Sequence, residues 1–144
     1  MRKKCNRKRY VPGAYIARHT PIAKDNQDKL AVHYHLSLEA MRRGYGSEQA
    51  WQSLADAVNI SLCMAESNGL KRDNFAEINE ASCALVTCRD RFKSSGKWGM
   101  TGDELKSVMR AMAIYDEQNA MATVSQQVRS LAEVRVRMEI GDIR

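Results

Sequence analysis

Proline and long apolar runs are scarce in this chain of 144 residues. Only Pro12 and Pro21 occur, both near the start, so no proline blocks helix formation over the remainder. No apolar run approaches the roughly 18–20 residues that are needed to cross a bilayer. The basic start is also not followed by the apolar segment of a secretory signal. These absences predict a cytoplasmic protein without a membrane partner.

Cysteine is sparse and follows no metal-binding pattern. The four cysteines, Cys5, Cys63, Cys83 and Cys88, form no C-x-x-C pair, which argues against structural zinc. Because no export signal is present, we expect reduced thiols, with the last three buried on helices as small apolar side chains. We expect no metal and no cofactor.

Start and stop signals divide the chain into a leader and four helices. Residues 1–25 hold both prolines and a basic run, and they predict a basic arm with an extended leader. Residues 26–144 predict a single all-α domain that resembles a four-helix bundle. Its helices are expected over about 26–43, 47–68, 74–94 and 103–139, the last one opened by a capping box of Thr101 and Glu104.

The first helix has a strand as its alternative, because residues 32–38 alternate between apolar and polar side chains. Asp25 can cap a helix start and Gly44 can end one, and these two signals decide for helix. An apolar row also recurs at helical spacing, formed by Leu30, Tyr34, Leu38 and Met41.

The second helix has a helix-turn-helix motif as its alternative, over residues 54–61. In that motif the next helix presents polar or basic side chains to the DNA groove. Residues 62–68 are apolar and acidic instead, and such a face would repel phosphate. We therefore predict one uninterrupted core helix.

The C-terminal helix is too long for a compact domain of this size. A continuous helix over residues 103–139 would measure about 55 Å, whereas the domain diameter is on the order of 37 Å. Its apolar row rotates near residues 117–123, so we expect a break or kink there, with a straight helix as the alternative. The part after the rotation is the predicted contact with a partner protein or a second copy, through Val128, Leu131, Val134 and Met138.

The positive charge of the chain is concentrated in its first nine residues. Of the 23 basic residues six lie there without an acid, which leaves 17 basic against 17 acidic side chains in residues 10–144. Flexible cations bind phosphate by releasing counterions, so this arm predicts contact with nucleic acid. A solvated end, an acidic protein or a lipid surface remain alternatives. The six residues are Arg2, Lys3, Lys4, Arg7, Lys8 and Arg9.

The remaining motifs give weaker evidence for a binding or catalytic site. Tryptophan often dominates binding hot spots, so Trp98 is a candidate partner-binding residue, with packing back onto the core as its alternative. His33 and His35 diverge by about 200° on a helix, which precludes a shared metal ion. Acidic side chains are scattered over helix faces and indicate no catalytic arrangement, so we do not expect an enzyme.

Two stretches, Gly96 to Leu105 and Ala113 to Gln118, resemble uncharacterised short helical accessory proteins that bacterial phages and plasmids carry. The resemblance covers the C-terminal third of the chain, and no functional residue carries over from it. It implies an accessory role such as regulation or inhibition of a host or defence protein complex.

These observations together predict a binding protein. The first hypothesis is an accessory protein of a mobile element that docks on a protein partner, with the arm touching nearby nucleic acid. The alternatives are a small regulator that binds DNA or RNA, and a structural or oligomerising phage or plasmid protein.

Overall fold

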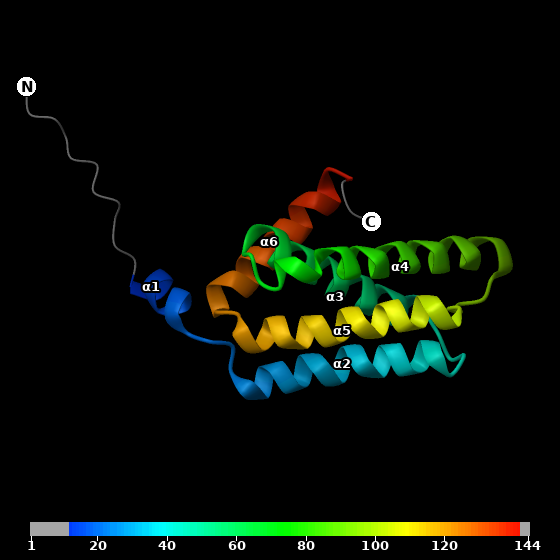
Figure 1. The fold of residues 1–144 in the computed structure, drawn as a ribbon, viewed down its shortest axis with the longest axis horizontal. Helices are drawn as coiled ribbons and strands as arrows, with labels where there is room; N and C mark the ends of the chain where they lie inside the picture. The colour runs from blue at the N-terminus through cyan, green and yellow to red at the C-terminus, as the bar shows by residue number, and fades with distance from the viewer. Residues whose placement is uncertain (1–11, 142–144) are drawn as a thin grey trace, which may run out of the picture.

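A computed structural model describes residues 12–141 of the chain (Figure 1). The described residues contain helices and no strand, which confirms the predicted all-α fold class. None of these helices combines the length and the apolar character needed to cross a membrane. In chain order they are α1 (Pro12–His19), α2 (Lys24–Arg42), α3 (Glu48–Ser67), the short 3-10 helix η1 (Arg72–Asn74), α4 (Phe75–Ser95), α5 (Gly102–Met121) and α6 (Val124–Glu139).

Helix α3 lies at the centre of the molecule. It packs against α2, α4, α5 and α6, and in Figure 1 α2, α5 and α4 run side by side with α3 behind them. Fourteen of its 20 residues are buried, including Leu54 and Ala57 at 0% exposure. Such burial on several sides is typical of a core helix. The prediction of one uninterrupted helix, in preference to a helix-turn-helix, is confirmed.

A fully buried glutamine joins three segments around α3. The amide nitrogen of Gln118, on α5, donates to the backbone oxygens of Ser61 (3.1 Å) and Leu70 (3.0 Å). Its amide oxygen accepts from the hydroxyl of Ser61 at 2.6 Å. Because a buried amide without partners costs free energy, this arrangement fixes how α5 sits against α3.

The predicted capping box at the start of α5 is confirmed. The hydroxyl of Thr101 accepts from the backbone N–H of Glu104 (3.3 Å), and the Glu104 carboxylate accepts from the N–H of Thr101 (2.8 Å). Arg91, on α4, donates to both carboxylate oxygens of Glu104. The guanidinium lowers the pKa of Glu104. The pair therefore stabilises the fold at neutral pH, and this contribution is lost as the pH falls through that lowered pKa.

The predicted interruption of the C-terminal helical stretch is a break. Helices α5 and α6 are separated by Ala122 and Thr123, both in extended conformation. A second capping box starts α6, in which the Thr123 hydroxyl accepts from the N–H of Gln126 (3.3 Å) and the Gln126 side chain accepts from the N–H of Thr123 (2.9 Å). Two extended residues change the helix direction, so α6 runs obliquely to α5 (Figure 1).

The segment between α1 and α2 is held against this break. The N–H of Val124 donates to the backbone oxygen of Thr20 at 2.9 Å, and the N–H of Ile22 donates to that of Ala122 at 3.3 Å. The side chain of Ile22 is buried in the core, and α1 packs against α6. The entry into α2 therefore satisfies backbone groups that the break leaves without helical partners.

The prediction of an extended leader over residues 1–25 is wrong for Pro12–His19, which form α1. Proline predicts extended chain in many contexts, but it is also favoured at the first position of a helix, where its missing N–H would have no partner. Residues 1–11 lie outside the described residues, so the prediction of an extended arm there is untested.

Replacing Gln118 with alanine is expected to lower the free energy of unfolding by about 2–4 kcal/mol, because it leaves buried polar groups without partners and opens a cavity. Urea unfolding followed by circular dichroism measures the change. The matched control is Gln52→Ala, on the exposed side of α3, for which less than about 0.5 kcal/mol is expected. Equal losses in both variants would contradict the role assigned to Gln118.

Candidate functional site

The outward face of α6 carries a row of exposed apolar side chains. Val128, Leu131 and Met138 are 59%, 41% and 46% exposed, and their spacing of three and seven residues puts them on one side of the helix. We refer to these three residues as the α6 row. Val134, the fourth residue predicted for this contact, is only 6% exposed and belongs to the core cluster. It lies on the side of α6 that packs against α3, so it does not contribute to the row.

The arginines of α6 are divided between its two sides. Arg137 contacts Glu66 at 2.7 Å and also pairs with Glu133. Burial disfavours its charge, but the two carboxylates outweigh burial and raise the pKa of Arg137. Arg129 and Arg135 are exposed, and neither has an ion-pair partner within residues 12–141. At helical spacing Arg135 lies on the side of α6 that carries the α6 row, whereas Arg129 lies on a different side. The row is therefore accompanied by one positive charge, Arg135, that the described residues leave unpaired.

Trp98 lies in the loop between α4 and α5 and is half-buried. Its ring stacks on Phe92 with 4.1 Å between centroids and on Trp51 with 5.7 Å. A side chain at Gly46 would come within 2.9 Å of the Trp98 Cβ, so the loop before α3 closes tightly over it. This geometry agrees with packing onto the core, the alternative expected for Trp98 from the sequence. A role for Trp98 in partner binding stays a prediction.

The six basic residues predicted to bind nucleic acid lie outside the described residues. Their contact with phosphate therefore stays a prediction. They are Arg2, Lys3, Lys4, Arg7, Lys8 and Arg9.

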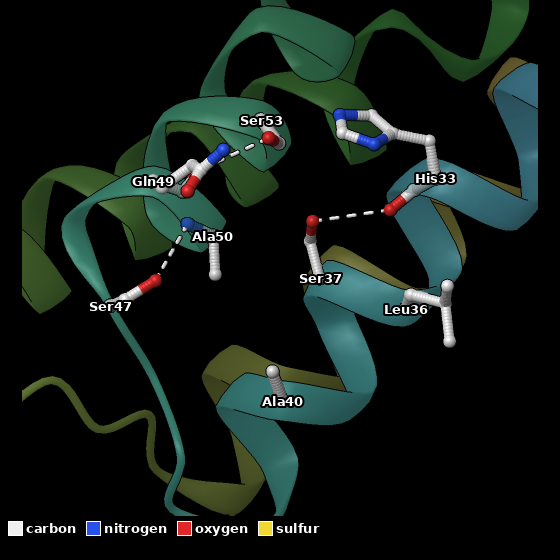
Figure 2. Close-up of a pocket in the computed structure, with 8 residues that line it drawn as sticks. All are labelled: His33, Leu36, Ser37, Ala40, Ser47, Gln49, Ala50 and Ser53. Carbon is white, nitrogen blue, oxygen red and sulfur yellow. Dashed lines mark hydrogen bonds between the residues drawn. The ribbon is translucent and has the colours of Figure 1, made fainter.

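A hollow of about 250 Å³ opens between α2 and the start of α3 (Figure 2). Its hydroxyl groups are engaged locally, since Ser37 donates to the backbone oxygen of His33 (3.1 Å) and Ser53 to that of Gln49 (2.9 Å). Figure 2 shows the His33 imidazole directed towards α3, and no acidic side chain lines the hollow to pair with it. The hollow offers space and small side chains for binding, without an assembled acid, base or nucleophile.

The histidines and cysteines are dispersed. His35 contacts Asp116 of α5 at 2.7 Å, on a different side of α2 from His33. Within residues 12–141 no group of three or more potential metal ligands comes together. Cys63 and Cys88 are buried, and burial raises the pKa of the Cys88 thiol. The prediction of burial is wrong for Cys83, which is exposed on α4.

A second exposed apolar surface, on α2, was not predicted from the sequence. Val32 and Leu36 on α2 are 59% and 65% exposed. They lie opposite the predicted inward row, of which Leu38 and Met41 are buried. The signal was present, because two large apolar residues on this helix fall outside the row assigned to the core.

No protein family, no curated protein and no solved structure matches this chain.

Replacing Trp98 with alanine is expected to lower the free energy of unfolding by about 2–4 kcal/mol, because two aromatic rings lose their stacking partner. Thermal and urea unfolding measure this. The control is Tyr45→Ala, since Tyr45 is 78% exposed and should change stability by less than about 0.5 kcal/mol. Unchanged stability in Trp98→Ala would contradict the packing role and favour a partner contact.

Proposed function

We propose that this protein is a non-enzymatic binding protein that docks on a partner protein through the α6 row. The observation that carries the proposal is a helix face with Val128, Leu131 and Met138 exposed beside one unpaired arginine, Arg135. Moving an apolar side chain of this size from full exposure to full burial yields about 1.5–3 kcal/mol, so each of these half-exposed side chains would contribute roughly half of that. Arg135 supplies charge complementarity to an acidic side chain next to the apolar contact.

We further propose that the partner belongs to a host or defence complex, which the protein modulates or inhibits. Support for this comes from the resemblance of residues 96–105 and 113–118 to accessory proteins of phages and plasmids. The partner surface that fits the α6 row is a helix or groove with an apolar centre and acidic flanks.

Changing Leu131 to glutamate is expected to abolish partner capture, because it places an acid in the middle of the α6 row. Tagged wild-type protein and the variant are compared on the same resin with a bacterial lysate. Proteins that only the wild type retains are identified, purified and titrated by calorimetry. We expect the dissociation constant to rise at least about tenfold in the variant.

The matched control for this experiment is Val136→Glu. Val136 is 55% exposed on the same helix but lies about 120° from the α6 row, so the same acid is introduced at a different location. Retention of the same proteins by Leu131→Glu would contradict docking through the row. Equal loss in both variants would point to a general effect of charge on α6.

A second candidate function is a small regulator that binds DNA or RNA. It is favoured by the concentration of six basic residues in the first nine positions of a chain that is otherwise electrically balanced. On this proposal the arm supplies most of the affinity, and the helical domain supplies the regulatory contact.

Deleting residues 2–9 is expected to abolish nucleic-acid binding measured by fluorescence anisotropy with a labelled duplex of mixed sequence. In the full chain the logarithm of the association constant should fall with the logarithm of salt concentration, with a slope of about −5 for six phosphate contacts. The control is the full chain with Lys71→Ala, which removes a cation elsewhere. Unchanged affinity after the deletion would end this second proposal.

A further inference from the structure

The side of α2 that faces away from the core carries a row with an ordered pattern of charge. Helix α2 packs against α3 and α5 and forms one edge of the molecule (Figure 1). Its outward residues follow each other at spacings of four and three, as they do in the contact row of a coiled coil. We refer to them as the α2 row, which consists of Asp25, Lys29, Val32, Leu36, Glu39 and Arg43.

The side chains of the α2 row reach solvent. Those of Asp25, Lys29 and Arg43 are 77%, 72% and 65% exposed, and that of Glu39 is 38% exposed. Val32 and Leu36, in the middle of the row, are the apolar pair noted above. Within the described residues the row is thus an unpartnered helix face with an apolar centre and charged ends.

The order of charges makes the α2 row complementary to itself when reversed. Along the chain the row reads acid, base, apolar, apolar, acid, base. In an antiparallel pair of such rows, Asp25 meets Arg43, Lys29 meets Glu39 and Val32 meets Leu36. Each of the six positions then faces one of opposite charge or of the same apolar character.

We propose that two copies of this chain associate as a symmetric dimer in which the α2 rows pack antiparallel, with Val32 of each copy against Leu36 of the other. A contact of this kind uses the same patch on both copies, as a two-fold axis requires. This surface is separate from the α6 row, so the dimer presents two α6 rows for partner proteins.

The charges of the α2 row also disfavour a parallel arrangement of the two helices. In a parallel pair each position faces its own copy, so Lys29 would meet Lys29 and Glu39 would meet Glu39. Like charges in direct opposition are unfavourable. The antiparallel pair instead places the ion pair of Asp25 with Lys29 (2.7 Å) opposite Glu39 and Arg43 (2.5 Å), so that unlike charges face each other. Glu39 also accepts hydrogen bonds from Arg42 on the same helix.

The surface beside Leu36 has room for the side chains of a second copy. The hollow in Figure 2 lies on one side of Leu36 and is lined mainly by small residues, including Ala40, Ala50 and Ser53. A second, shallow depression runs along the surface of α2 beside Val32 and Leu36 and is lined by residues of that helix alone. Side chains that protrude from one helix can therefore enter depressions of the other, as packing of ridges into grooves requires.

The dimer is expected to be concentration-dependent, because one helix of about 28 Å on each side makes a contact at the small end of specific interfaces. Sedimentation equilibrium of the full chain from about 1 to about 100 µM tests this. The average mass should rise from 16.3 kDa towards twice that value. A mass that stays at the monomer value throughout would overturn the proposal.

Two substitutions of the same kind locate the contact. Leu36→Glu should keep the chain monomeric over the whole range, because it puts an acid at the centre of both copies of the α2 row. Val128→Glu, an equally exposed apolar residue on α6, should leave the dimer unchanged. Thermal unfolding of both variants confirms that they are folded. A dimer that survives Leu36→Glu, or that Val128→Glu disrupts, would overturn the assignment to α2.

A charge exchange tests the antiparallel pairing directly. Lys29→Glu and Glu39→Lys should each weaken self-association roughly tenfold, because each creates two like-charge pairs across the symmetric contact. When the two variants are mixed, the new glutamate of one copy faces the new lysine of the other, and the mass should return to that of the wild type. A double variant carrying both changes should also dimerise. A mixture that remains monomeric would overturn the pairing.

Discussion

The burial of α3 on nearly every side is the constraint on which the rest of the structure depends. With α3 filling the centre, each surrounding helix needs only one face to close the core, as Leu38 and Met41 do for α2 and Val134 does for α6. The opposite faces of α2 and α6 are then free to carry other side chains. Exposed apolar residues on these outer faces do not contribute to the core. They therefore indicate contacts with other proteins.

The break between α5 and α6 decides where the second of these faces lies. A continuous helix would carry residues 124–139 away from the body. Two extended residues, a capping box at Thr123 and backbone hydrogen bonds to Thr20 and Ile22 instead redirect α6 onto α3. The chain before α2 therefore contributes to the position of the proposed docking surface, although it lies about 100 residues away in sequence.

Local signals in the sequence were enough to predict much of the fold. Thr101 caps α5 as expected, and the rotating apolar row located the break. The expected cap at Asp25 is wrong, because the N-cap of α2 is Ala23. The role of Val134 could not be predicted, because an apolar row does not reveal which of its members faces the core. Helix α1 was not predicted because proline occurs both in extended segments and at the first position of helices. The hydrogen bonds between Gln118 and Ser61 join residues 57 positions apart, and no local pattern indicates them.

A fixed core built on α3 presents separate proposed binding faces on α2 and α6. Amide and methyl NMR spectra of the full chain, recorded while its concentration is raised, test this most directly. The account predicts shifts confined to residues 25–43 and the adjoining start of α3, with the buried remainder of α3 and the α6 row unchanged. Shifts that spread through the core, or that centre on α6, would contradict it.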